Sequence, residues 1–178
     1  NLDEDGLTPS NYDLISLKKS ISIPVRIMVR PHSNSFNYND DDLIQMKETI
    51  KFCKNQKFDG VVFGCLDDND ELDLNKIKYL ADFAKPLNVI IHKAIDLTSS
   101  PVNSLKKLLE INNVNGVLTS GGCETADLGT EVLKKMINIS PHCFEIISAG
   151  KITKQNFKIL KKKLTESFIM EEKSLELS

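Results

Sequence analysis

The segment Asn88-Val89-Ile90-Ile91-His92 decides the fold, because similar apolar segments recur before and after it at a fixed interval. Gly60-Val61-Val62-Phe63-Gly64 begins 28 residues earlier, and Gly116-Val117-Leu118-Thr119 begins 28 residues later. Two further segments, residues 25–30 and 144–148, extend the series on either side. An interval of about 30 residues holds one strand and one crossover helix, so the series predicts five parallel strands.

The five segments are continuously apolar rather than alternating, which is typical of parallel strands covered by helices. Repeated strand–helix units of this length occur in (β/α)8 barrels and in doubly wound open sheets. The sequence has neither the G-x-G-x-x-G motif of dinucleotide-binding folds nor a phosphate-binding loop that ends in Gly-Lys-Ser/Thr. We therefore predict an α/β fold of the TIM (β/α)8-barrel type. Because five strands are fewer than eight, the expected form is an incomplete barrel, with flanking helices and the strands adjacent in sequence order.

The segments between the predicted strands have helical patterns. Asn39 is expected to cap the first of these helices, and the apolar stripe of that helix places Cys53 between helix and sheet. A last helix is expected from about Thr153, with Phe157 and Leu160 on its buried side.

Composition and charge exclude several classes of function. The chain of 178 residues carries 23 basic and 25 acidic side chains, a net charge of −2, which offers no field for nucleic acid or an anionic membrane. No apolar run approaches the roughly 20 residues of a membrane span, and no secretory leader is recognised at the start. The four cysteines include no C-x-x-C pair, so a structural zinc site is not expected. We expect a cytoplasmic protein with reduced thiols.

Polar residues end the predicted strands, where parallel α/β folds carry their chemistry. Arg30, His92 and Asp96 are candidates for catalysis, with Arg30 holding an anion and His92 with Asp96 moving a proton. The turn Ser120-Gly121-Gly122 leads toward a helix and is a possible anion site. Structural alternatives are an ion pair between Arg30 and Asp96, a hydrogen-bonded buried His92, and a tight turn that requires glycine.

Several of these motifs, in this order, resemble the copper homeostasis protein CutC family. The motifs that carry the resemblance are Gly6-Leu7-Thr8-Pro9-Ser10, residues 27–31, residues 60–64, His92-Lys93-Ala94-Ile95-Asp96 and Leu118-Thr119-Ser120-Gly121-Gly122. The resemblance runs from Asp5 to Phe157 and implies a cytoplasmic TIM barrel associated with copper tolerance, for which Cu(I) binding is proposed. It also implies that the five predicted strands are the family's third to seventh.

The resemblance divides the chain into a partial barrel domain, residues 1–165, and a divergent C-terminal tail, residues 166–178. The family's eighth strand is expected after the last helix, and residues 169–174 have no apolar segment long enough to supply it. Cysteines that the family carries at its first two strands are not in this chain. His32 stands where the family pattern has arginine, and Lys93 stands where it has a second arginine.

Three functions remain open at this point. The first is copper homeostasis with copper as Cu(I), for which Cys65, Cys123 and His92 are the soft ligands at adjacent strand ends. The second is a TIM-barrel enzyme that acts on a small anionic substrate through Arg30, His92, Asp96 and residues 120–122. The third is a gene product without independent activity. The two unpaired edges of a five-stranded arc predict a homo-oligomer.

Overall fold

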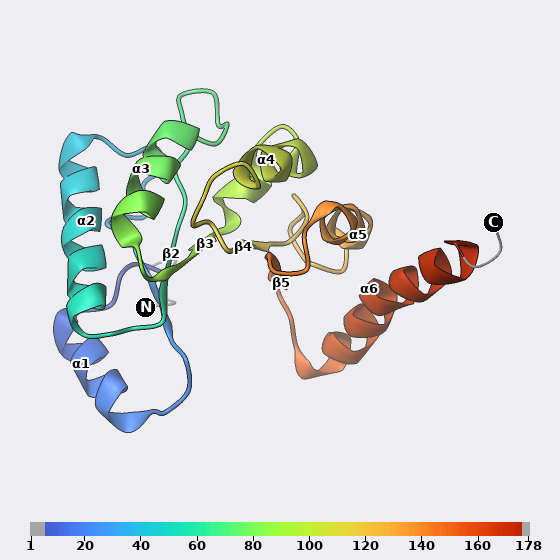
Figure 1. Ribbon diagram of the computed structural model, residues 1–178, viewed down its shortest axis with the longest axis horizontal. Helices are drawn as coiled ribbons and strands as arrows, with labels where there is room; N and C mark the ends of the chain where they lie inside the picture. The colour runs from blue at the N-terminus through green and yellow to red at the C-terminus, as the bar shows by residue number, and fades with distance from the viewer. Residues whose placement is uncertain (1–5, 176–178) are drawn as a thin grey trace.

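The computed structural model describes residues 6–175, which form five strands and a series of helices around them (Figure 1). The strands are β1 (Arg26–Met28), β2 (Gly60–Phe63), β3 (Asn88–Ile91), β4 (Gly116–Thr119) and β5 (Glu145–Ser148). The helices are α1 (Asn11–Ser20), α2 (Asp40–Asn55), α3 (Leu74–Ala84), the short 3-10 helix η2 (Lys93–Leu97), α4 (Pro101–Leu108), α5 (Thr130–Ile139) and α6 (Lys154–Leu175).

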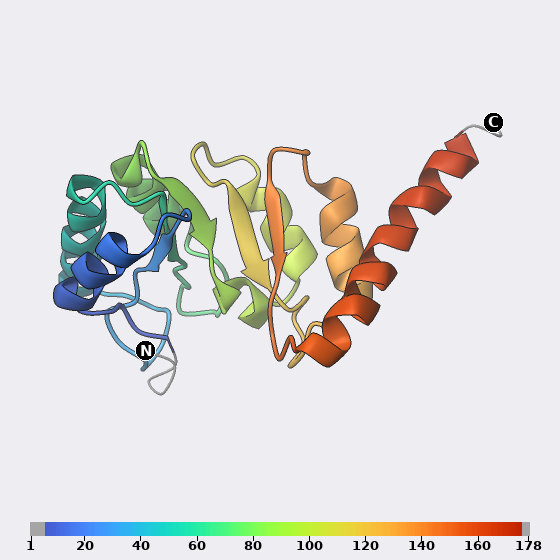
Figure 2. The same cartoon turned by 90° about the horizontal axis from the view of Figure 1, so that it is seen from below.

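The strands form one parallel sheet in the order β1-β2-β3-β4-β5. Each strand therefore lies beside the next one in the chain, as the 28-residue interval predicts. Within residues 6–175 the sheet is open, with β1 and β5 at its edges. Figures 1 and 2 show the helices following one another beside the sheet in sequence order. The predicted five-stranded arc of parallel strands is confirmed.

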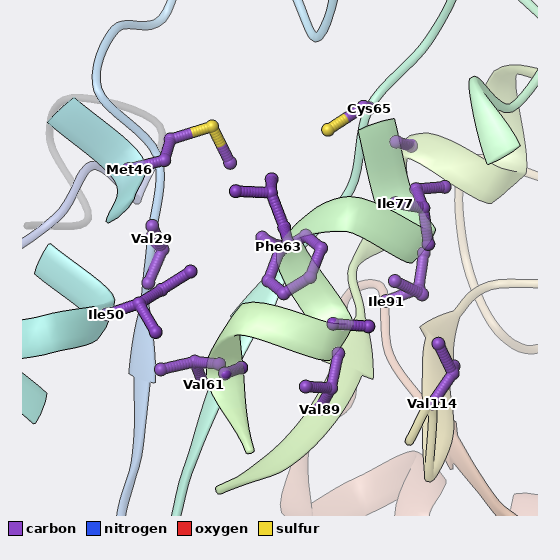
Figure 3. Close-up of a cluster of buried hydrophobic side chains, with 14 of the residues drawn as sticks. Val29, Met46, Ile50, Val61, Phe63, Cys65, Ile77, Val89, Ile91 and Val114 are labelled. Atoms are coloured by element: carbon purple, nitrogen blue, oxygen red, sulfur yellow. The ribbon is translucent and has the colours of Figure 1, made fainter. Parts of the chain in front are cut away.

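The two faces of the sheet differ in their surroundings. On the helix-facing side, Val61, Phe63, Val89 and Ile91 pack against apolar residues of α2 and α3, such as Ile50 and Ile77, in one buried cluster (Figure 3). Alternate residues of the same strands point the other way. We call this second side the inner face; it carries Met28, Val62 and Leu118, which are only partly buried.

The start of α2 follows its sequence closely. The side chain of Asn39 accepts a hydrogen bond from the Asp42 N–H at 3.0 Å, and the Asp42 carboxylate accepts one from the Asn39 N–H at 3.0 Å. This reciprocal capping box satisfies two backbone donors that the first helical turn leaves unpaired. Further along α2, Cys53 is fully buried in the helix–sheet core, as predicted.

The last helix corrects one expectation. Leu160 is buried beside Ala126 and Leu133, but Phe157 is 53% exposed, so the predicted burial of Phe157 is wrong. Leu160 faces the body of the molecule, whereas Phe157, one turn earlier, borders a surface hollow with Ile152 and Leu164. Figure 2 shows α6 extending away from the sheet. The helix continues through residues 169–174, where the sequence showed no strand. None of the helices in residues 6–175 has the length and apolar character needed to span a membrane.

Candidate functional site

The polar residues predicted at the strand ends lie on the inner face at the carboxyl edge of the sheet. Arg30 lies two residues beyond β1, and His92 follows β3 directly. The register pairs Met28 with Val62 and Phe63 with Ile91. Continued to the carboxyl edge, this register places Arg30, Gly64 and His92 in one row across three neighbouring strands.

Gly64 brings His92 toward Arg30. A Cβ atom at position 64 would lie 2.8 Å from His92 Nδ1, so the imidazole occupies the space that a side chain would need. Because the ring leans over β2, it approaches the strand that carries Arg30. The ring of Phe36 completes the contact: its centroid is 4.5 Å from that of His92 and 4.7 Å from the guanidinium carbon of Arg30.

His92 is a neutral hydrogen-bond donor in this setting. Its side chain is 3% exposed, and Nδ1 accepts a hydrogen bond from the Ala94 N–H at 3.1 Å. Burial, followed by the charge of Arg30, lowers the pKa of His92 to about 3. Since Nδ1 accepts, the proton of the neutral ring is on Nε2. That buried Nε2 has no hydrogen-bond partner among the described residues.

Arg30 is fixed through its backbone by the sequence motif near the start of the chain. Its N–H donates to Thr8 Oγ1 at 2.8 Å, and its carbonyl accepts from the Thr8 N–H at 3.1 Å. The guanidinium donates to the carbonyl of Ser33 at 3.3 Å, which ties it to the loop that follows β1. Arg30 is 9% exposed, so its charge acts in a region with little water.

The Asp96 carboxylate is engaged by groups of its own chain. Its carboxylate accepts hydrogen bonds from the N–H groups of Ser120 and Gly122, both at 2.9 Å, and from Thr119 Oγ1. Lys93 Nζ lies 3.2 Å from the same carboxylate, so the ion pair is with Lys93 rather than Arg30. Burial raises the pKa of Asp96, but the donated hydrogen bonds outweigh it, and the pKa is lowered.

This arrangement fills the expected anion site from within the chain. The backbone donors of residues 120 and 122 bind Asp96, and the Gly121 N–H donates to Thr119 Oγ1 at 2.9 Å. Gly121 and Gly122 have φ values of 72° and 73°, a conformation that glycine adopts without strain. Asp96 therefore fixes the turn and remains a carboxylate. Arg30 and His92 face the inner side at the same edge of the sheet.

The three predicted copper ligands are not gathered into one cluster. Cys65 continues the alternation of Val61 and Phe63, so it lies on the helix-facing side among apolar side chains (Figure 3), whereas His92 lies on the inner face. Burial raises the pKa of the Cys65 thiol to about 12, whereas Cu(I) is bound by thiolate. Cys123 is partly exposed beyond the Asp96-bound turn.

In residues 6–175, no group of three or more His, Cys, Asp or Glu side chains is placed to hold a metal ion. The donors Cys65, Cys123 and His92 therefore do not fit a shared Cu(I) centre in this arrangement.

Three residues of the site were missed by the sequence reasoning. His32 Nε2 lies 3.3 Å from an oxygen of Asp42, and the His32 ring packs on Tyr38 with centroids 5.2 Å apart. Tyr38 is 1% exposed, and burial raises its pKa. His32 was marked by its position in the polar loop after β1 and by the arginine that the family pattern has there. Tyr38 had only its position in that loop, and Asp42 is accounted for by helix capping alone.

The comparisons with known proteins agree with this fold. The family model described as the CutC family matches residues 1–169. A CutC family protein of Yersinia pseudotuberculosis serotype O:1b (strain IP 31758) is 36% identical over 147 residues, 83% of this chain and 58% of the relative. A CutC family protein of Edwardsiella ictaluri (strain 93-146) is 32% identical over the same length. The chain thus spans less than two thirds of the curated relatives it matches.

A solved structure supports the same assignment. The crystal structure of CutC from Streptococcus agalactiae superposes with a TM-score of 0.84 at 25% identity, covering 93% of this chain and 81% of the other. The parallel strands in sequence order, with their polar residues at the carboxyl edge, define a protein of the TIM-barrel type. Within that class, the chain belongs to the CutC family.

Proposed function

We propose that this chain acts in copper homeostasis in the cytoplasm and interacts with Cu(I). The observation that carries the proposal is the match of the CutC family model to residues 1–169. The name of the Streptococcus agalactiae neighbour proposes a copper homeostasis role for that protein, and we extend the same role to this chain.

The copper proposal is tested by anaerobic competition between the full chain and a chromophoric Cu(I) chelator. Stoichiometric uptake supports it, and failure to compete at any chelator ratio contradicts a direct interaction. Cys65→Ser and Cys123→Ser locate the contact. Because the Cys65 thiol is buried on the helix-facing side, Cys65→Ser should leave uptake unchanged, whereas the partly exposed Cys123 can be reached from solvent.

The second candidate is the binding of a small anion at the inner face, as in TIM-barrel enzymes that act on anionic substrates. The observation that favours it is the approach of Arg30 to a neutral, donating His92 across Gly64. A positive guanidinium and an N–H donor in a water-poor region suit a carboxylate or phosphate. Asp96 and residues 120–122 support this candidate by holding the edge of the sheet in shape.

Thermal unfolding of the full chain with propionate and with inorganic phosphate tests the second candidate. Stabilisation that rises with anion concentration, is absent with a matched chloride series and is lost in Arg30→Gln supports it. Arg26→Gln is the matched control, because Arg26 is on the same face at the opposite end of β1. Equal stabilisation of wild type and Arg30→Gln would contradict an anion site at Arg30.

We also propose that the chain forms a homo-oligomer, since β1 and β5 each have one side unpaired within residues 6–175. Light scattering after size exclusion, over a range of protein concentrations, tests this. A monomer at every concentration would contradict it.

A further inference from the structure

The buried polar atoms that lack a partner are grouped at one place in the described chain. His32 Nδ1 and His92 Nε2 have no hydrogen-bond partner among the described residues, although each atom is buried. Ring contacts join His32 to Tyr38, and join both Arg30 and His92 to Phe36. The charge of Arg30 acts on Tyr38 and so links the two sets. Buried polar atoms without a partner are rare in folded proteins, so two in one cluster require an explanation.

One side of this cluster suits an oxyanion. His92 supplies the Nε2–H donor, and Arg30 supplies the positive charge. Gly64 allows the imidazole to lean toward Arg30, and Phe36 packs on both groups and limits their contact with water. Charge-assisted hydrogen bonds are strengthened in such surroundings.

The other side of the cluster suits a hydroxyl group. Asp42 faces His32 Nε2 at 3.3 Å, and this carboxylate favours the tautomer of the neutral ring that has its proton on Nε2. His32 Nδ1 is then an acceptor, whereas His92 Nε2–H is a donor. The Asp42 carboxylate is itself fixed by the N–H of Asn39 in the capping box, so the position of His32 is set by the first turn of α2.

We propose that this cluster binds a small hydroxylated carboxylic acid, with its carboxylate at Arg30 and His92 and its hydroxyl donating to His32 Nδ1. The inference rests on the second proposed function, the anion site at Arg30, and adds the class of ligand. Asp42 is a positioning residue: it does not touch the ligand but orients the imidazole that does. The His32 side chain is 26% exposed, so this end of the cluster is next to solvent.

The test compares two acids of the same length that differ by one hydroxyl group, lactate and propionate, by calorimetric titration of the full chain at pH 8. A neutral hydrogen bond contributes about 1 kcal/mol, so the Kd for lactate should be about fivefold lower than that for propionate. His32→Gln retains an amide nitrogen that can reach Asp42 but has no atom in place of Nδ1. This variant should bind propionate as wild type does and bind both acids equally.

Asp42→Asn tests the positioning role. It should reduce the lactate-to-propionate preference, because the amide no longer fixes the tautomer of His32, while the helix cap keeps an acceptor oxygen for Asn39. The preference is a ratio of two affinities of the same protein, which a general loss of stability does not change. A preference that persists in His32→Gln would overturn the assigned role of His32.

The outcomes separate this inference from the anion site itself. If propionate binds and lactate binds no better, the hydroxyl assignment is overturned and the anion site stands. If neither acid binds wild type, both are overturned. Inorganic phosphate is a third probe, because its phosphorus atom carries both oxyanion and hydroxyl groups. If phosphate binds more tightly than lactate, and if His32→Gln weakens that binding, the assignment to a carboxylic acid is overturned.

Discussion

Arg26 and Glu145, 119 residues apart and on the two edge strands of the sheet, form a bidentate ion pair across its inner face. Arg26 Nη1 donates to Glu145 Oε2 at 2.9 Å, and Nη2 donates to the second carboxylate oxygen. Glycines are their register partners: Gly60 is opposite Arg26, and Gly116 is opposite Glu145. The missing side chains leave room for the pair, which connects the two ends of the open sheet at its amino edge.

The Arg26–Glu145 pair should make a small, salt-sensitive contribution to stability. The side chains are 30% and 45% exposed, so water screens their attraction. In a double-mutant cycle of Arg26→Gln and Glu145→Gln we expect a coupling of about 0.5–1 kcal/mol at low salt, measured by urea unfolding. The coupling should fall in 1 M NaCl. The cycle for Lys134 and Glu131, neighbours on α5, is the control and should give less. Zero coupling at low salt would show that the pair does not tie the edges together.

Substitution of Gly64 should displace His92. A Cβ atom there would lie 2.8 Å from Nδ1 and 2.9 Å from Cε1 of the imidazole, distances at which something must move. We expect Gly64→Ala to lower the free energy of unfolding by about 1–3 kcal/mol. In a His92→Ala background the same change should cost much less, because the ring is gone. Equal costs in both backgrounds, measured by chemical denaturation, would rule out this clash as the cause.

The fold was predictable because its signals are local and repeated. The interval between apolar segments gave the five strands and their order, and Asn39 gave the start of α2. The exposure of Phe157 was not predictable from the helical pattern, since the pattern shows which residues share a face but not where the packing partner ends.

The site was only partly predictable. Arg30, His92 and Asp96 were recognised because charge at the end of a buried strand is unusual, but their partners depend on register. Cys65 and His92 both follow strand ends, but the register places Gly64, not Cys65, beside His92. Cys65 is one position further along the chain, so its side chain faces the helices instead. The His32–Asp42 contact joins a loop to a helix cap, and neither residue has a sequence pattern that names the other.

The four thiols should differ in reactivity. Burial raises the pKa of Cys65 to about 12 and that of Cys53 to about 11, so both remain protonated and shielded at pH 8. Cys143 is exposed and Cys123 partly exposed. We expect a thiol reagent to modify Cys143 first, then Cys123, and to reach Cys53 and Cys65 only after unfolding in urea. Mass spectrometry of peptides checks the order; rapid native labelling of Cys65 would contradict its placement.

Replacement of Asp96 should destabilise the chain most at neutral pH. Asp96→Asn presents N–H donors to the N–H groups of Ser120 and Gly122 and loses the charge opposite Lys93. We expect a loss of about 2–4 kcal/mol at pH 7. The pKa of Asp96 is lowered in the folded chain, so its contribution is present above the unfolded pKa of about 3.9 and is lost as pH falls through the folded pKa. The difference between wild type and variant should therefore shrink below pH 4. Glu131→Gln, on the exposed surface of α5, is the control and should show little change at any pH.

His92 should produce a pH dependence in a separate, higher range. Its pKa is about 3 in the folded chain and about 6.5 in an unfolded one, so below pH 6.5 the unfolded state binds a proton that the folded state does not. The free energy of unfolding should therefore decrease as the pH is lowered through this range, by up to about 1.4 kcal/mol per pH unit from this group. His92→Asn keeps an acceptor for the Ala94 N–H but cannot be protonated. We expect the variant to be less stable than wild type at pH 7, because the smaller side chain leaves space under Phe36, and the gap should narrow from pH 6.5 to pH 4.5. Urea unfolding at half-unit steps of pH measures both curves, with His142→Asn, in the segment before β5, as the matched control. Parallel curves for wild type and His92→Asn would mean that His92 takes up its proton in the folded chain as readily as in the unfolded one. That result would contradict the neutral, donating His92 assigned above.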